Sequence, residues 1–207
     1  MNVTSKLVSA VFHPLLIATY LFALLSLTLP SALEPIPFGG HKSFLLLILT
    51  VTFLLPALNL TIFKVLGSVP TLTMENRKER IIPFILITIF YGVITYLFSA
   101  RYHVSTDDNV FKLILILYAL VMITTVITFF FKVSVHSLAI WGVIGIIIPL
   151  NKVSENGMLF IPTIVLLVIA GLIMSSRLYL QVHTTREVLV GTLVGFMTSF
   201  VGMVLLF

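Results

Sequence analysis

Long runs of apolar residues, separated by short polar breaks, follow one another along the whole chain. Each run is close to the roughly 20 residues that a helix needs to cross the hydrocarbon core of a bilayer. A helix forms the hydrogen bonds of its backbone groups internally, and this is required in a bilayer because lipid tails offer no hydrogen-bond partners. The pattern therefore predicts an all-α integral membrane bundle of about seven transmembrane helices. The seven runs are Leu7–Leu29, Ser43–Phe63, Ile81–Ala100, Leu113–Phe131, Val133–Leu150, Met158–Ser176 and Val188–Phe207.

Composition supports the same interpretation and limits the domain count to one. Hydrophobic residues make up 59% of the 207 residues and charged residues only 9%, whereas a soluble domain carries about a quarter charged residues. We expect one transmembrane domain over residues 1–207. The first run, Leu7–Leu29, is longer than the roughly 7–15 apolar residues of a signal peptide, so we expect a retained span, interrupted near its start by His13-Pro14.

Charge and cysteine usage exclude several function classes. The chain has no cysteine, which rules out disulfides and thiolate chemistry. Its net charge is +5, but the basic residues sit at the ends of apolar runs and form no continuous stripe. Membrane lipids are therefore the expected partners and nucleic acid is not. Because several of these cations are also candidate ligands, the charge bias does not assign the compartment that the site faces.

Three of the polar breaks differ from ordinary loops, and alternate crossing places all three on one membrane face. They are the densely charged stretch 71–80, the short break 132–137 and the stretch 175–187. The acidic pair Asp107-Asp108 falls on the opposite face. The side chains that can converge at the first face are Arg77, Lys78, Arg80, Lys132, Ser134, His136, Arg177, His183, Arg186 and Glu187.

Histidines, fixed cations and a carboxylate on one face suit phosphoryl transfer. Arginine binds phosphate through a planar fork of donors, and a neutral histidine can attack phosphorus while a protonated one supplies the leaving group with a proton. His183 and Glu187 are four residues apart, so they share a helical face. Ser134 and His136 begin a predicted span, where helix N–H groups favour anions.

Three segments in this order resemble the signatures of the type-2 phosphatidic acid phosphatase superfamily. Ser176–Glu187, read as Ser-Arg, five residues, His, three residues and Glu, is similar to the third signature and continues into Val-Leu-x-Gly at 188–191. Ser134–Ser137 resembles the second signature, Ser-Gly-His-Ser. Arg77–Pro83 loosely resembles the first, Lys-x6-Arg-Pro. Together these segments lie within residues 77–191.

The resemblance implies a hydrolase that removes phosphate from lipid phosphates or diphosphates through a phosphohistidine intermediate, without metal or cofactor. His183 would be the nucleophile, His136 the acid for the leaving group, and Glu187 the carboxylate that orients His183. Phosphatidic acid, phosphatidylglycerophosphate, lipid A and undecaprenyl diphosphate are substrates in the family, and we expect a multi-pass protein of a bacterial inner membrane. The resemblance further implies phosphate-binding roles for Arg177, Arg80, Arg77 and Ser134.

Departures from the signatures keep a second interpretation open. Glu187 stands where the family has aspartate, Val135 where it has glycine, and Thr73 where the first signature has lysine. A catalytically inactive or repurposed member that binds or transports a lipid phosphate would tolerate all three. A metal-dependent prenyl transferase would need paired aspartate-rich motifs, and Asp107-Asp108 has no partner.

Structural roles compete with the functional ones at several residues. His13, His41 and His103 are expected to be interfacial residues. Thr184 and Glu187 form a potential capping box that opens the last span, which would use the same carboxylate as His183. Ser134 is equally suited to cap the fifth span. Arg77, Lys78 and Arg80 could instead mark a cytoplasmic loop or bind anionic lipid head groups. Arg177 and Arg186 could be anchors at helix ends.

Overall fold

A computed structural model describes residues 2–65, 76–100, 104–154 and 157–207, and all regular secondary structure in this part is helical, with no strand. Short 3₁₀ turns, η1 (Pro30–Leu33) and η2 (Phe38–Gly40), follow the second helix, and a π-helical turn, η3 (Thr50–Leu54), joins the third helix to the fourth. The α-helices are α1 (Asn2–Val11), α2 (Pro14–Thr28), α3 (His41–Leu49), α4 (Leu55–Val65), α5 (Arg77–Ala100), α6 (Asn109–Thr128), α7 (Val135–Val153), α8 (Phe160–Tyr179) and α9 (Thr185–Leu206).

The predicted membrane bundle is confirmed. Six helical segments of the described chain are long and apolar enough to span a membrane, and the segment Phe38–Val65, built from η2, α3, η3 and α4, is one of them. A seventh span results if α1 and α2 count as one, although they are bent by 58° at their junction. The predicted interruption at His13-Pro14 is therefore a sharp break in the helix axis, as expected where proline cannot continue the preceding helix.

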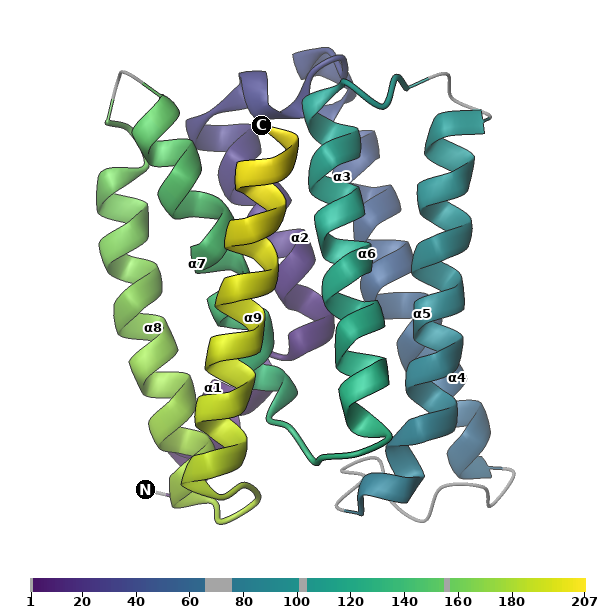
Figure 1. Ribbon diagram of the computed structural model, residues 1–207, viewed down its shortest axis with the longest axis vertical. Coiled ribbons are helices and arrows are strands. Elements are labelled where there is room, and N and C mark those ends of the chain that lie inside the picture. The colour runs from purple at the N-terminus through teal and green to yellow at the C-terminus, as the bar shows by residue number, and fades with distance from the viewer. Residues whose placement is uncertain (1, 66–75, 101–103, 155–156) are drawn as a thin grey trace.

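The helices alternate in direction, and this places the candidate residues at one end of the bundle. In Figure 1 the N-terminus, the start of α5, the α6–α7 connection and the α8–α9 turn all lie at the lower end, and the C-terminus lies at the upper end. The α5–α6 connection, with Asp107 and Asp108, lies at the upper end as well. The two-faced arrangement expected from counting spans is therefore the observed one.

The start of α5 differs from the sequence expectation. The predicted apolar run begins at Ile81, but the helix begins four residues earlier, at Arg77. Asn76 explains the earlier start, because its carbonyl accepts the N–H of Glu79 and its side-chain amide donates to the Glu79 carboxylate. These bonds satisfy groups at the helix start that would otherwise lack partners. Arg80 is consequently a residue of the first helical turns.

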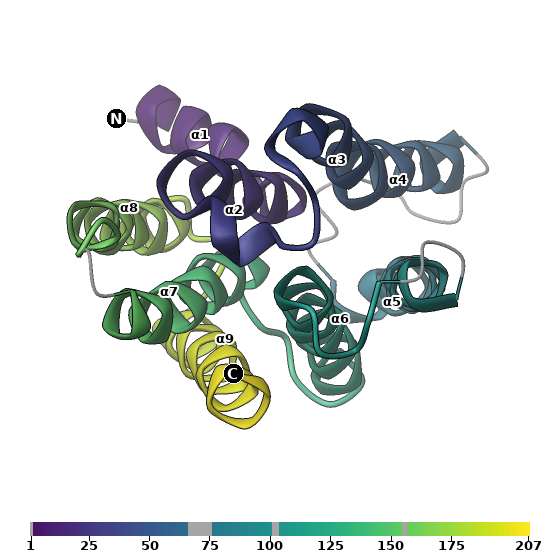
Figure 2. The same ribbon diagram turned by 90° about the horizontal axis from the view of Figure 1, so that it is seen from above.

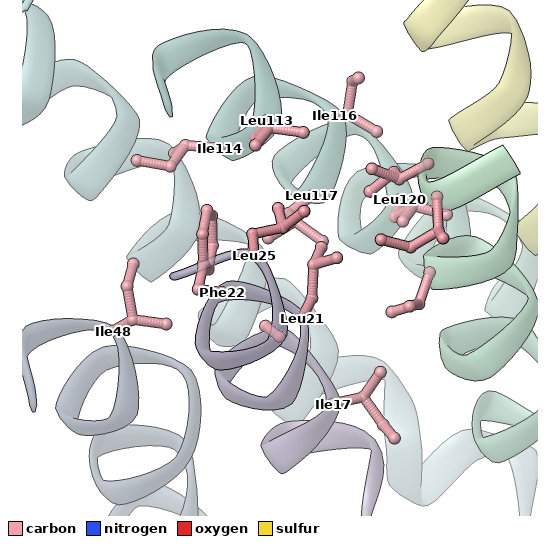
Figure 3. Close-up of a cluster of buried hydrophobic side chains, with 14 of the residues drawn as sticks. Ile17, Leu21, Phe22, Leu25, Ile48, Leu113, Ile114, Ile116, Leu117 and Leu120 are labelled. Carbon is pink, nitrogen blue, oxygen red and sulfur yellow. The ribbon is translucent and has the colours of Figure 1, made fainter. Parts of the chain in front are cut away.

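The second helix lies at the centre of the bundle and the main core forms around it. Seen from above, α2 is surrounded by α1, α3, α6, α7 and α8 (Figure 2). Leu21, Phe22 and Leu25 on α2 are fully buried and meet apolar side chains of α3 and α6, such as Ile48 and Leu117 (Figure 3). The outer helices keep large apolar side chains exposed, which suits contact with lipid.

Helices α7 and α9 approach so closely that only glycine fits between them. A Cβ on Gly191 would lie 2.6 Å from the carbonyl oxygen of Ser134, and a Cβ on Gly195 would collide with the backbone of Leu138. Small residues commonly allow this close packing of membrane helices. The contact joins the start of α7 to the start of α9.

We predict that Gly195→Ala destabilises the protein, because the added methyl group meets backbone atoms that cannot rotate away. Overpacking of this kind costs about 1–3 kcal/mol, so the midpoint of thermal unfolding in detergent should fall clearly below that of the wild type. Gly171→Ala is the matched control, since nothing lies within 4 Å of its Cβ position on α8. Equal midpoints for the two variants would contradict the packing argument.

Candidate functional site

A cavity of about 520 Å³ opens at the lower end of the bundle and collects most of the predicted site residues. Its apolar side comes mainly from α2, α4 and α5, through Leu15, Leu60, Phe84 and Ile87. Its polar side combines residues that are far apart in the sequence: Lys6, Ser9, His13, Arg80, His136, Arg177 and His183. The two histidines of the resemblance thus line a single cavity, with cations beside them and an apolar wall opposite.

The α8–α9 turn presents His183 with its orientation fixed by Glu187. The Nδ1 atom of His183 lies 2.6 Å from a carboxylate oxygen of Glu187, and the histidine side chain is 2% exposed. A carboxylate only accepts hydrogen bonds, so Nδ1 carries the proton and the lone pair is on Nε2. Thr184 caps α9 by accepting the N–H of Glu187. Of the two hydrogen bonds of the expected capping box, the one accepted by Thr184 is therefore present. The carboxylate of Glu187 binds His183 instead of the backbone N–H of Thr184.

Lys132 ties this turn to the α6–α7 connection. Its ammonium donates to the carbonyl of Val182 and lies 3.9 Å from the Glu187 carboxylate. Gln181, one residue earlier, reverses the chain with a φ of 54°. A left-handed residue after a helix end is a common way to leave a helix. The turn thus has a fixed shape with His183 inside and Lys132 against it.

Burial lowers the pKa of His183, and the nearby guanidinium groups of Arg80 and Arg177 lower it further. The hydrogen bond and the charge of Glu187 act in the opposite direction but do not restore the ordinary value. The imidazole is therefore neutral at pH 7, with an available Nε2 lone pair. A neutral histidine beside a carboxylate and two cations is the state that a nucleophile for phosphorus requires.

His136 lies in the first turn of α7 and is oriented by the N-terminal helix. Its Nε2 lies 3.1 Å from the carbonyl oxygen of Ser9, to which it donates. In the neutral ring the Nδ1 atom is then the unprotonated one, and it is the position at which His136 can gain and lose a proton. The ring of His13 stands nearly perpendicular to that of His136, with 5.8 Å between centroids.

Two arginines line the cavity close to each other. Arg177, in the last turn of α8, lies close enough to Arg80 for their like charges to interact. Arg80 also donates to the carbonyl of Val133, whereas the Nε of Arg177 is buried without a hydrogen-bond partner among the described residues. No carboxylate is among the described residues that line the cavity. Such a site attracts an anion strongly, because the cations are partly removed from water.

Arg77 and Ser134, two predicted phosphate ligands, are not among the residues that line the cavity. Arg77 donates a hydrogen bond to the carbonyl of Phe129 at the end of α6. Ser134 is fully buried at the N-terminal boundary of α7, where its hydroxyl accepts a hydrogen bond from Ser137. Of the predicted residues, His183, His136, Arg177 and Arg80 line the cavity and Glu187 lies directly behind His183.

The sequence analysis missed the contribution of the N-terminal helix. Lys6, Ser9 and His13 line the cavity from α1 and its junction with α2. Their spacing, together with Ala10, follows the one-face pattern of a helix, and this signal was available in the sequence. His41, by contrast, is buried near the other end, where its ring nitrogens lie within hydrogen-bond distance of Ser26 and the carbonyl of Ile36.

The other residues considered from the sequence do not join the cavity. Asp108 accepts the N–H of Ser105 in the α5–α6 connection, at the opposite end of the bundle. In the part of the chain that is described, no three His, Cys, Asp or Glu side chains form a group able to hold a metal ion. Thr73 and His103 lie outside the described residues.

Comparisons with protein-family models, with curated proteins and with solved structures find no match to this chain. The resemblance to phosphatidic acid phosphatases therefore depends on the motif residues alone. Any function has to be argued from the chemistry of the cavity.

We predict that His183 titrates below the ordinary imidazole pKa of about 6.5, because burial, Arg80 and Arg177 disfavour its charged form. Glu187→Gln should lower this pKa further, since the carboxylate is the group that favours the proton. NMR titration of histidine-labelled protein in detergent measures both values, and His183→Asn assigns the signal. A wild-type value at or above 6.5, or a higher value in Glu187→Gln, would contradict the prediction.

Proposed function

We propose that this chain is a membrane phosphatase that hydrolyses a lipid phosphate or diphosphate through a phosphohistidine intermediate. The observation that carries the proposal is the hydrogen bond of His183 to Glu187 at the wall of a cavity that also holds His136 and two arginines. The bond leaves Nε2 of His183 as a lone-pair donor. The arginines supply the positive charge that a transferring phosphoryl group needs.

The reaction follows from these positions in two displacements. In the first, Nε2 of His183 forms a bond to phosphorus, the bond from phosphorus to the leaving oxygen breaks, and protonated His136 gives that oxygen its proton. Glu187 stabilises the positive imidazole ring that results. In the second, neutral His136 accepts a proton from water, the water oxygen attacks phosphorus, and the nitrogen–phosphorus bond breaks to release inorganic phosphate.

The apolar wall of the cavity supports an amphiphilic substrate. Leu60, Phe84 and Ile87 face the same space as the cations, so a phosphate head group and the first carbons of a hydrocarbon tail can occupy it together. A second, apolar cavity of about 90 Å³ shares lining residues with the first, among them Leu15 and Phe84. The bacterial inner membrane and lipids such as undecaprenyl diphosphate, which the resemblance implies, are part of the proposal.

We predict that His183→Ala loses phosphate release from lipid phosphates by about 10³-fold or more, the range seen when a covalent nucleophile is removed. The assay is inorganic phosphate release in detergent micelles, with and without EDTA. His41→Gln is the control, because it removes a histidine at the opposite end of the bundle. In the wild type, rapid quenching in base should trap acid-labile ³²P on the protein. Equal release by His183→Ala and wild type would exclude the proposed nucleophile.

A second candidate function is binding or transport of a lipid phosphate without turnover. Two observations favour it: Glu187 also approaches Lys132, which competes for its charge, and Val135 occupies the family's glycine position and lines the cavity. A protein of this kind needs the arginines but not the nucleophile.

We predict that Arg177→Gln weakens binding of a short-chain lipid phosphonate about tenfold or more, because it removes a charge-assisted contact in a partly dehydrated cavity. His183→Ala should keep most of this binding while abolishing turnover. Calorimetric titration in detergent measures the affinities. Saturable binding by a wild type that never releases phosphate would favour the second candidate, and unchanged binding in Arg177→Gln would contradict the anion site itself.

A further inference from the structure

The N-terminal helix forms one wall of the cavity with a single stripe of residues. Lys6, Ser9 and Ala10 follow the spacing that places side chains on one helical face of α1, His13 lies in the junction between α1 and α2, and all four residues line the cavity. The helix α1 packs against α8, which carries Arg177. Nothing in the phosphatase signatures extends to this part of the chain, so its role in the site needs its own explanation.

The groups around the cavity have an order in space. His183 interacts electrostatically with Arg80 and Arg177, whereas His136 interacts with Arg177, His183 and His13. His13 in turn interacts with Arg177. The printed contacts place the α1 side of the cavity next to His136, because the His13 and His136 rings have 5.8 Å between centroids and Ser9 lies on α1. The hydrogen bond from His136 to the carbonyl of Ser9 fixes this side of the arrangement.

The order defines where a leaving group would lie. In a displacement at phosphorus the attacking and leaving atoms are roughly in line, and the proposed proton transfer requires the leaving oxygen to lie beside His136. The remainder of the leaving group then extends toward Lys6 and His13. The Nδ1 of His13 accepts the N–H of Leu15 at the start of α2, which leaves its Nε2–H as a donor.

Resting on the phosphatase function proposed above, we infer that Lys6 and His13 form a subsite for an anionic leaving group, so that the substrate is a diphosphate ester. A simple alcohol as leaving group would have no use for these donors. Three fixed cations line the cavity, Lys6, Arg80 and Arg177, with no carboxylate among the described lining residues. The charge of Glu187 acts on Arg80, which leaves Lys6, together with His13, as the cation on the α1 side of His136 that a second phosphate would meet.

The chemistry of the inferred reaction is balanced with water as the only co-reactant. The terminal phosphorus binds Nε2 of His183, and the bridging oxygen keeps the electron pair of the bond that breaks. His136 gives this oxygen a proton, which produces a lipid monophosphate in contact with Lys6 and His13. Hydrolysis of the phosphohistidine then releases inorganic phosphate and restores the neutral ring of His183.

Binding of two non-hydrolysable probes tests the subsite without requiring turnover. The probes are an alkyl methylenebisphosphonate and the alkyl phosphonate with the same tail, titrated into the full chain in detergent. Any purification tag belongs at the C-terminus, away from α1. We expect the wild type to bind the bisphosphonate about tenfold or more tightly than the phosphonate, the size of one or two charge-assisted hydrogen bonds.

Lys6→Gln should reduce this preference several-fold, and His13→Asn should do the same while keeping an acceptor for the start of α2. Lys42→Gln, an equal charge change at the opposite end of the bundle, should preserve the preference. Equal affinity of the wild type for the bisphosphonate and the phosphonate would overturn the subsite. An equal decrease of both affinities in Lys6→Gln would overturn it as well. Phosphate release is measured separately, so a chain that prefers the bisphosphonate but never releases phosphate refutes the enzyme and not the subsite.

Discussion

The close contact of α7 with α9 is the constraint on which the rest of the site depends. Gly191 and Gly195 let the two helices approach until backbone meets backbone, and the N–H of Ser134 donates to the carbonyl of Glu187 at the start of both helices. His136 is two residues beyond Ser134 in the chain. Glu187 holds His183. The contact therefore brings two histidines, 47 positions apart in the chain, to the wall of one cavity.

The cavity beside this contact also holds two neighbouring positive charges, those of Arg80 and Arg177. Arg80 and Arg177 interact unfavourably with each other, and burial adds to the cost of keeping both charged. Glu187 offsets part of the charge of Arg80, and an anion bound between the two arginines would relieve the remaining repulsion. Functional sites commonly keep such unfavourable arrangements because a ligand relieves them. The same groups keep His183 neutral, so in the proposed phosphatase one feature would serve both anion binding and nucleophilic attack.

Much of the fold was predictable from the sequence, because each apolar run has the length of a membrane span and lipid leaves the backbone few alternatives. The exact start of α5 was not, since it depends on hydrogen bonds from Asn76 that no hydrophobic pattern records. Helical spacing predicted the contact of His183 with Glu187, although His183 lies in the turn before α9 and reaches Glu187 across the helix start. The side chains of Arg77 and Ser134 are able to bind phosphate, but in the structure they form hydrogen bonds with the carbonyl of Phe129 and the hydroxyl of Ser137.

The contribution of α1 shows where spacing alone is insufficient. Lysine and histidine near the start of an apolar run look like ordinary interfacial residues. The two helices α1 and α2 are bent by 58° at the junction that holds His13. Helix α1 packs against α8, which is more than 100 positions away in the sequence. Long-range packing of this kind leaves no trace in local pattern.

The turn between α8 and α9 is held in place by hydrogen bonds at several positions. Lys132 donates a hydrogen bond to the carbonyl of Val182, and the Glu187 carboxylate accepts one from His183. The hydroxyl of Thr184 accepts the N–H of Glu187 at the start of α9. A preorganised turn loses little conformational entropy when it engages a lipid head group. For the proposed phosphatase, the slow stage of an encounter would then be lateral diffusion of the lipid and withdrawal of its head group from water, with no folding of the nucleophile's own loop.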